Sequence, residues 1–255
     1  MNKTVRVRPI KWKKDSAKNG IVTFTLSSWK YFQDFFAQEL LDTKNYVFRG
    51  QSDETWKLEP SIHRILKHIG KTEYKSKIKF HLENFKYSLR GRVSNLKDII
   101  TDNNELWAIG QHHGLHTPLL DFTFSPYVAA YFAFVEVNKE TKYRIIYCLS
   151  QYAINKQIDD ELNIYRPVSD HNPRLLNQSG LFVRFDTELD IEALFKIKYR
   201  EKETMAKLYK IKIPNKDREV CLKFLNRMNI NHNTLFPDIT GASIYCNMEL
   251  AISNY

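Results

Sequence analysis

The sequence predicts a single α+β domain in which a mixed or antiparallel sheet is flanked by helices. Three observations lead to this prediction. Residues 142–150 and 208–213 are rich in β-branched and aromatic residues, as strands are. Residues 27–40 and 217–228 carry apolar side chains at helical spacing. No segment rich in Gly, Pro or Ser divides the 255 residues, so we expect one domain over residues 1–255.

The composition is that of an ordinary soluble protein, with 43% hydrophobic and 27% charged residues. No apolar run is long enough to span a bilayer, and the basic N-terminus is not followed by a signal-peptide core. We therefore expect no membrane association and a cytoplasmic location. Cys148, Cys221 and Cys246 are scattered in apolar settings, which predicts buried thiols rather than a disulfide framework or a metal site.

The formal net charge of +10 favours a polyanionic partner, although a basic surface that only aids solubility is the alternative. Residues 72–102 predict a long basic helix whose apolar face includes Phe80, Phe85 and Leu89. Such a charged face is usually only solvated. If the chain contacts a nucleic-acid backbone, this helix is our first choice, because phosphate contacts need positive charge and no particular sequence. The candidate contact residues are Lys75, Lys79, Lys86, Arg90 and Arg92.

The N-terminal part predicts a strand, a helix and a second strand in that order. Residues 1–18, which include Arg6 and Arg8, alternate weakly and predict a solvated edge strand, with a phosphate-binding arm as the alternative. Ser27 is expected to cap a helix that ends at Asn45. Residues 46–48 predict a short strand that leads into Arg49, and a helix is expected from residues 60 or 61 to about 69.

Arg49 at the end of a strand, followed at once by Gly50, is a candidate binding position. A guanidinium offers a planar fork that suits phosphate or carboxylate, and a glycine lets backbone or ligand approach closely. The alternative is a structural pair between Arg49 and a carboxylate such as Asp121.

A polar segment precedes a buried helix in the middle of the chain. Residues 111–114 read Gln-His-His-Gly and predict a turn, and a short apolar step then leads to Asp121 and Thr123. Ser125 and Pro126 predict the helix start, because Ser caps and Pro suits the first helical position. Residues 127–134 are almost all apolar, as in a helix buried on most sides. The polar groups before this helix predict a site, and its first amides favour an anion.

The remaining elements are predicted from the same patterns. Residues 142–150 predict a central strand, and residues 151–170 predict an irregular loop. Gln178 lies in a turn before a strand at residues 181–185. Residues 194–199 and 208–213 alternate as half-exposed strands do, and Asp217 caps a helix to about residue 228. A last helix begins near residues 236–238, with Ile244, Tyr245 and Met248 facing inward.

Two linked motifs resemble the FRG domain family, which is named for its Phe-Arg-Gly motif. The first is Tyr46-Val47-Phe48-Arg49-Gly50-Gln51, and the second is QHHGLHTPLLDFTFSPYVAAYFA at residues 111–133. The FRG core would span about residues 27–185, with residues 190–255 packed on it. The layout of the family looks like that of ADP-ribosyltransferases that consume NAD: an Arg at the end of a first strand, a Thr or Ser ahead of a helix, and a later polar residue on another strand.

The resemblance implies an NAD-dependent ADP-ribosyltransferase, with RNA or DNA as a reasonable acceptor and a toxin or anti-phage setting. An antitoxin or other regulatory protein would then be a partner. The alternative is a non-catalytic module that senses a nucleotide or nucleic acid. Gln178 stands where such transferases commonly have a glutamate, which weighs against the usual catalysis.

Each candidate residue suits one part of ADP-ribosyl transfer. Arg49 suits the pyrophosphate, Thr123 the ribose, and Tyr127 or Tyr131 the nicotinamide face, although core packing is the alternative for the tyrosines. A histidine can bond ribose or act on the acceptor proton. The expected catalytic residues are His112, His113, Asp121 and Gln178, and the expected NAD-binding residues are Arg49, Gly50, Gln51, Gln111, Thr117, Thr123, Tyr127 and Tyr131.

Other chemistries have less support in the sequence. His112, His113, His116 and Asp121 could ligate a metal, but adjacent histidines do not easily face one ion, so no metal is expected. The sequence contains no Walker loop, dinucleotide glycine fingerprint or Gly-x-Ser-x-Gly turn. A nuclease would need clustered carboxylates, which the sequence does not show.

Overall fold

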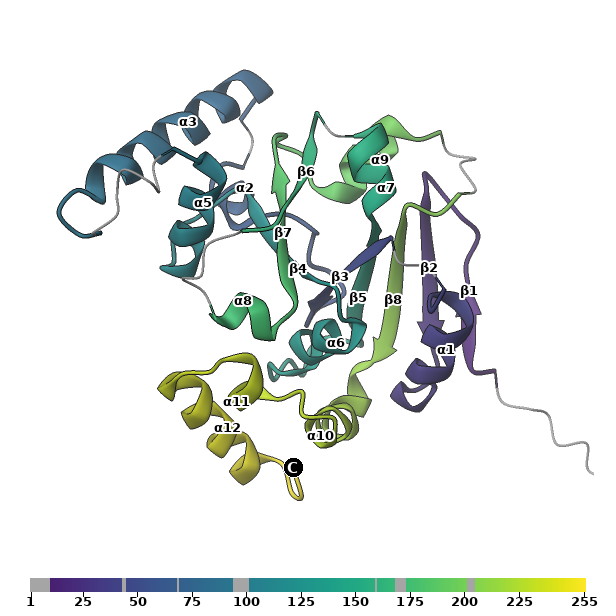
Figure 1. Cartoon of the computed structure of the whole chain (residues 1–255). Helices are drawn as coiled ribbons and strands as arrows, with labels where there is room; N and C mark the ends of the chain where they lie inside the picture. Colours follow the sequence, from purple (N-terminus) through teal and green to yellow (C-terminus); the bar gives the residue numbers. More distant parts are fainter. Residues whose placement is uncertain are drawn as a thin grey trace, which may run out of the picture.

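The computed structural model describes residues 10–42, 45–67, 69–93, 101–158, 160–167, 173–200 and 205–255. These residues form an eight-stranded sheet in the order β1-β2-β8-β5-β3-β4-β7-β6 (Figure 1). All neighbours pair antiparallel except β2 and β8, which are parallel. The predicted α+β class, with a mixed sheet and flanking helices, is confirmed. The strands are β1 (Trp12–Lys14), β2 (Ile21–Leu26), β3 (Tyr46–Gln51), β4 (Leu119–Thr123), β5 (Tyr143–Ser150), β6 (Leu162–Tyr165), β7 (Gly180–Phe185) and β8 (Leu208–Pro214).

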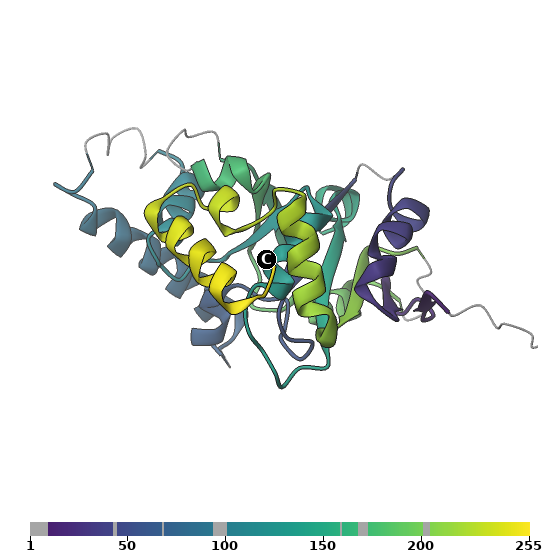
Figure 2. The same cartoon turned by 90° about the horizontal axis from the view of Figure 1, so that it is seen from below.

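Helices cover both faces of the sheet and one of its ends. On one face lie α1 (Phe32–Glu39), α6 (Pro126–Phe134), α10 (Arg218–Arg227) and α12 (Ile239–Ala251), and on the other lie α7 (Gln151–Gln157) and α9 (Ile191–Lys198). Near β4 and β7, α3 (Lys71–Ser88) packs on α5 (Asn103–His112). The short helices are η1 (Trp29–Tyr31), α2 (Ser61–Ile65), α8 (Pro173–Asn177), η2 (Asn215–Asp217) and α11 (His232–Leu235). Helices α10, α11 and α12 lie below the sheet in Figure 1 and therefore in front of it in Figure 2, which is seen from that side.

Strand β5 lies in the middle of the core, as the sequence predicts. Its side chains alternate between the two faces, so that Ile146 and Cys148 join one hydrophobic cluster while Ile145 and Tyr147 join the other. All four are fully buried. A strand that is buried on both faces has a continuous apolar run, which explains why residues 143–149 are easily recognised in the sequence.

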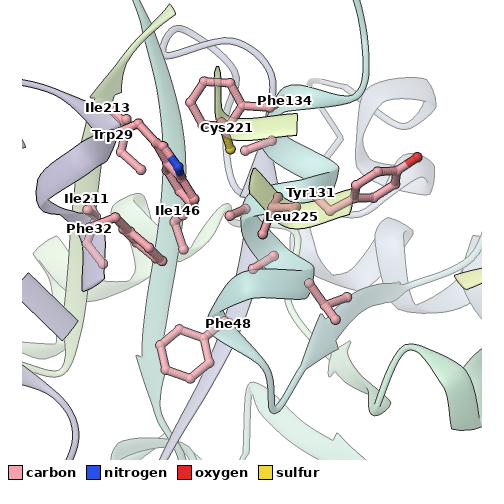
Figure 3. Close-up of a cluster of buried hydrophobic side chains, with 14 of the residues drawn as sticks. Trp29, Phe32, Phe48, Tyr131, Phe134, Ile146, Ile211, Ile213, Cys221 and Leu225 are labelled. Atoms are coloured by element: carbon pink, nitrogen blue, oxygen red, sulfur yellow. The ribbon is translucent and has the colours of Figure 1, made fainter. Parts of the chain in front are cut away.

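Helix α6 forms the centre of the core on its face of the sheet (Figure 3). The Ser125 hydroxyl accepts a 3.2 Å hydrogen bond from the Val128 amide, and Pro126 opens the first turn, as predicted. The helix crosses β3 at Gly50, where a Cβ atom would lie 1.9 Å from the Ala129 carbonyl oxygen. No side chain fits there, so the glycine of the Phe-Arg-Gly motif is needed for backbone packing.

Several element predictions were wrong. Residues 194–199 lie mostly in α9, because Asp190 caps a helix whose apolar Ile191, Leu194 and Phe195 recur at helical spacing. The expected loop at 151–170 contains α7 and β6. Gln111 and His112 form the last turn of α5, which Asp102 caps, rather than an isolated polar turn. Strand β2 was not predicted from the sequence.

Other predictions are confirmed within the described residues. Strand β1 lies at the sheet edge and is mostly exposed, whereas residues 1–9, with Arg6 and Arg8, lie outside those residues. The basic helix is α3, but it ends at Ser88, and Phe80, expected on its apolar face, is exposed. Residues 94–100 again fall outside the described part. Cys148 and Cys221 are buried thiols, but Cys246 is exposed on α12, contrary to the prediction. Among the helices of the described ranges, none has the length and apolar character that a bilayer crossing requires.

Candidate functional site

The site begins where β3 and β4 stop pairing. The two strands share one register position, Phe48 with Thr123, whereas β3 pairs with β5 at six positions. In an ordinary antiparallel ladder Arg49 would face Phe122. The Arg49 Nη1 atom instead donates a 2.7 Å hydrogen bond to the Asp121 carbonyl oxygen. The Arg49 side chain thus bonds to β4 where main-chain hydrogen bonds between β3 and β4 would otherwise be expected, and the two strands separate beyond this point.

A pocket of about 940 Å³ opens at this separation, a volume within the range of small-molecule sites. Its walls come from β3, the loop that follows it, α2, β4, α6 and two later turns. The lining residues are Phe48, Arg49, Gly50, Gln51, Ser52, Thr55, Trp56, Lys57, Glu59, Arg64, Lys67, Asp121, Phe122, Thr123, Ala129, Phe132, Glu136, Gln178 and Phe236. Both sequence motifs therefore contribute to one pocket, as the resemblance requires.

Arg49 is a largely buried cation of this pocket, and contacts with Asp121 hold its side chain. Its side chain is 24% exposed, and its Nη1 atom lies 3.7 Å from a carboxylate oxygen of Asp121, which is 65% exposed. Burial lowers the pKa of Arg49, and the nearby Arg64 lowers it further, whereas Asp121 opposes the shift. In the described part of the chain the buried Nε atom has no hydrogen-bond partner. Two neighbouring guanidiniums that share one exposed carboxylate, 3.7 Å from Arg49, favour a bound anion.

Gln111 and Thr117 hold Asp121 rather than line the pocket. The Gln111 Nε2 atom donates a 2.9 Å hydrogen bond to Asp121 Oδ1. The buried Thr117 hydroxyl donates in turn to Gln111 Oε1 and accepts from the Leu119 amide. These two residues, predicted to contact NAD, therefore act as positioning residues for the Asp121 side chain.

Thr123 and Gln178 line the pocket, but their polar atoms are largely occupied. The Thr123 hydroxyl donates to the Gln178 carbonyl oxygen at 2.7 Å and accepts from the Ser125 amide at 3.0 Å. The Gln178 side chain donates to the Leu235 carbonyl oxygen at 3.1 Å. Both residues join the strand ends to the start of α6 and to α11. This arrangement offers a ligand little hydrogen-bonding capacity from either side chain.

Gln51 differs, because one of its polar atoms is free. Its Nε2 atom donates a 3.2 Å hydrogen bond to the Lys57 carbonyl oxygen. Its Oε1 atom is buried and has no partner among the described residues. An unsatisfied buried acceptor costs free energy, so a pocket ligand with a donor group would gain from this position.

The two histidines that were predicted to act on the substrate do not line the pocket. His112 and His113 lie at the exposed end of α5, with ring centroids 5.0 Å apart. Partial burial lowers the pKa of His112, and His113 and Arg174 lower it further, while Asp238 opposes the shift. Besides His113, the charged groups that act on His112 are therefore those at the starts of α8 and α12, not those of the pocket.

The two tyrosines that were predicted to clamp nicotinamide belong to the core. Tyr131 belongs to the buried cluster of Figure 3 and is fully buried, and its hydroxyl lies 2.9 Å from His232 Nδ1. Tyr127 packs edge-on against Phe32, with ring centroids 5.5 Å apart. Neither lines the pocket. The aromatic residues that do are Phe48, Trp56, Phe122, Phe132 and Phe236, of which Trp56 is 51% exposed.

The structure adds charged residues that the sequence reasoning missed. Glu136 lines the pocket just after α6, and its Oε2 atom accepts a 3.1 Å hydrogen bond from the Ser52 hydroxyl. Glu59 and Lys67 line it from the loop before α2 and from the turn after it. Glu136 is the first charged residue after the apolar run of α6, so the end of that run was an available signal.

No cluster suited to a metal ion is found in the described ranges, and the three histidines near Asp121 do not form one. Lys57 is already engaged, since it pairs with Asp190 at 2.9 Å. In the same ranges, Arg64 and Lys67 form no ion pair, and both lie at the pocket rim. The pocket therefore combines free cations, one exposed aromatic ring and the three carboxylates of Glu59, Asp121 and Glu136.

Residues 44–142 match the family model of the FRG domain. The match includes β3, β4 and α6, and every residue that lines the pocket except Gln178 and Phe236. An FRG domain is thus identified in the chain, in agreement with the Phe-Arg-Gly motif and the segment after Gln111. No curated protein and no solved structure matches the chain.

Proposed function

We propose that the chain is an NAD-dependent ADP-ribosyltransferase whose substrate occupies the pocket between β3 and β4. The observation that supports this most is the meeting of Arg49, Asp121 and Thr123 in one pocket of about 940 Å³. These are residues that the resemblance to ADP-ribosyltransferases implies for NAD binding and catalysis. A dinucleotide fits the volume, and its pyrophosphate matches the two neighbouring guanidiniums of Arg49 and Arg64.

The cations of the pocket would bind the pyrophosphate directly or attract it at long range. Arg49 is held by Asp121 and faces the ligand with its remaining guanidinium atoms. Arg64 and Lys67 are exposed at the rim and have no acidic partner among the described residues. We assign the pyrophosphate to Arg49 and Arg64, with Lys67 adding long-range attraction. The half-exposed ring of Trp56 offers a stacking face for nicotinamide or adenine.

The reaction breaks the bond between nicotinamide N1 and C1′ of its ribose. Nicotinamide leaves with the bonding electron pair, and the ribose develops oxocarbenium character. An acceptor oxygen or nitrogen then forms a bond to C1′ and gives its proton to a base. A carboxylate near C1′ stabilises the positive charge, and this electrostatic effect is the main catalytic requirement.

We assign that carboxylate to Glu136. It lines the pocket, and the Ser52 hydroxyl orients it through a 3.1 Å hydrogen bond. Asp121 is engaged with Arg49 and Gln111 instead. Glu136 would fill the role of the glutamate that such transferases commonly have where this chain has Gln178. RNA or DNA is the proposed acceptor, and a toxin or anti-phage role with a regulatory protein partner is the proposed setting.

One observation favours the second candidate, a module that binds a nucleotide without turnover. Gln178 and Thr123 use their polar atoms in bonds to the protein itself. A site with this arrangement still binds anions through Arg49 and Arg64, and catalysis then depends on Glu136 alone. The two candidates differ in turnover and share the pocket.

The test is incubation of the full chain with NAD, followed by chromatography for free nicotinamide and calorimetry for binding. Release of nicotinamide that falls at least about 100-fold in Arg64→Ala/Lys67→Ala supports the enzyme, since both side chains are exposed and their loss should not unfold the protein. Lys156→Ala, on α7, is the matched control. Binding without release supports the sensor, and the absence of both contradicts the proposal.

A further inference from the structure

Helix α3 carries an exposed face that the pocket does not explain. The 18-residue helix buries Tyr74 and Leu82, and Ile78 and Phe85 pack beside Leu82 on α5. Both views place α3 at the end of the molecule away from β1 and β2 (Figures 1 and 2). The outer side of the helix is exposed along its whole length.

Two large aromatic side chains lie on that outer side. Phe80 is 68% exposed and Tyr87 is 69% exposed. They are seven residues apart, which is two helical turns, so both rings project on one side about 10 Å apart along the axis. The Arg90 guanidinium stacks on the Tyr87 ring at 3.4 Å from its centroid. Two exposed rings in line on a charged helix are unlike scattered surface apolar residues.

The charge around these rings is strongly positive. Of the acidic residues on α3, Glu73 pairs with Lys77 at 3.5 Å and Glu83 pairs with Lys86 at 3.1 Å. In the described residues, no acidic partner pairs with the remaining cations of α3 and the turn after it. These are Lys71, Lys75, Lys79, Arg90 and Arg92. The face therefore combines free cations with aromatic rings.

We propose that this α3 surface binds single-stranded nucleic acid. The free cations would contact the phosphates, and bases would stack on Phe80 and on the face of Tyr87 opposite the Arg90 guanidinium. Every base has an aromatic face, and stacking on protein rings is the usual means by which proteins hold single strands. A duplex keeps its base faces covered, so it would use the cations alone. The free cations favour a polyanion as the ligand, and the exposed rings of Phe80 and Tyr87 favour a polyanion whose bases are unpaired.

The surface does not fit a membrane equally well. An interfacial helix needs a broad apolar face, whereas Glu83 lies between Phe80 and Tyr87 along the helix and Ser76 lies one turn before Phe80, both exposed. The proposal is also independent of NAD use, because binding is measured with no NAD present. Its failure and that of the proposed transferase can therefore be told apart.

The test is fluorescence anisotropy of the full chain with labelled 12-residue oligouridine, oligodeoxythymidine and a DNA duplex at several salt concentrations. Phe80→Ala/Tyr87→Ala should weaken binding of both single strands at least about five-fold per ring, with an unchanged salt slope. Lys75→Gln/Lys79→Gln should weaken binding and reduce the slope by about 0.7 per lost phosphate contact. Matched controls are Tyr152→Ala and Lys139→Gln/Lys156→Gln, which remove exposed side chains elsewhere and should bind as the unaltered chain does.

Each result decides the proposal. Stronger binding of one single strand than the other identifies RNA or DNA, and loss through both α3 variants supports the surface in either case. Equal binding of the duplex, or loss through the lysine variant alone, overturns it, since stacking would then play no part. Self-association that Phe80→Ala/Tyr87→Ala abolishes would also overturn it, because a second copy would cover the rings. A thermal melt of each variant verifies its fold.

Discussion

The Arg49 guanidinium reaches the main-chain carbonyl oxygen of Asp121 at 2.7 Å, although the strands that carry these residues pair only at Phe48 and Thr123. The same side chain therefore closes the sheet and lines the pocket. The sequence left two interpretations of Arg49 open, ligand binding and a structural pair with Asp121. The two are compatible, because Arg49 contacts Asp121 and also lines the pocket.

The Arg49–Asp121 contact predicts unequal effects on stability. Arg49→Ala removes a hydrogen bond from a charged donor, which should lower the free energy of unfolding by about 1.5–3 kcal/mol. Asp121→Asn keeps the main-chain carbonyl and removes only an exposed ion pair at 3.7 Å, so it should cost less than about 1 kcal/mol. Urea unfolding of both variants measures the difference. Equal losses would mean that the carboxylate, rather than the carbonyl, holds Arg49.

Gly50→Ala should destabilise the protein by more than about 3 kcal/mol or prevent folding. The new Cβ would lie 1.9 Å from the Ala129 carbonyl oxygen and 2.5 Å from the Ala133 amide nitrogen, so α6 would have to move off β3. Gly70→Ala is the matched control, because nothing lies within 4 Å of its Cβ position and it should be nearly neutral. Thermal unfolding compares the two, and a fully stable Gly50→Ala protein would contradict this packing.

Glu136→Gln should abolish nicotinamide release while NAD binding persists. If the carboxylate stabilises the oxocarbenium, its loss should lower the rate about 100- to 1,000-fold. Ser52→Ala, which removes the 3.1 Å hydrogen bond to Glu136, should lower the rate less, since the charge remains. Glu140→Gln is the matched control in the exposed segment after α6. If Glu136→Gln released nicotinamide at an undiminished rate, Glu136 would be excluded as the carboxylate that stabilises the oxocarbenium, and Glu59 would be the next candidate.

The sequence was sufficient where local patterns determine structure. The cap at Ser125, the apolar run of α6 and the continuous apolar run of β5 each follow from the residues alone. The two ends of the site, Arg49 and Asp121, were found in the same way, from polar residues next to buried elements.

The remainder of the site depends on long-range contacts that a local pattern does not contain. Residues 111–114 read as a turn because the helical spacing of α5 is interrupted by its polar last turn. The direction of His112 and the burial of Tyr131 follow from how α5 and α6 pack, not from neighbours in sequence. Glu136 and Lys67 reach the pocket only because β3 and β4 separate. In the same way, residues 194–199, which lie mostly in α9, were predicted as a strand because six residues cover less than two helical turns, too few to separate alternation from helical spacing.

Buried His63 predicts that stability falls as the pH drops through the weakly acidic range. The ring is 4% exposed, and its Nε2 atom lies 2.8 Å from the Tyr74 hydroxyl. Burial lowers the pKa of His63 from 6.5 to about 4, with the Thr187 backbone and Asp190 opposing. Between pH 6.5 and 4, His63 is therefore protonated in the unfolded chain and neutral in the folded chain. The free energy of unfolding decreases by up to about 1.4 kcal/mol for each unit by which the pH falls. Over that window the loss reaches about 3 kcal/mol, and below pH 4 the contribution is constant.

Urea unfolding of the unaltered chain and of His63→Gln at pH 7, 6, 5 and 4 isolates this contribution, because other titrating groups are common to both proteins. His63→Gln should be less stable at pH 7, yet lose about 3 kcal/mol less between pH 7 and pH 4. Tyr74→Phe is the control: it removes the hydroxyl partner but leaves His63 buried, so the steep pH dependence should remain. Parallel pH curves for the unaltered chain and His63→Gln would show that His63 takes up its proton in the folded state.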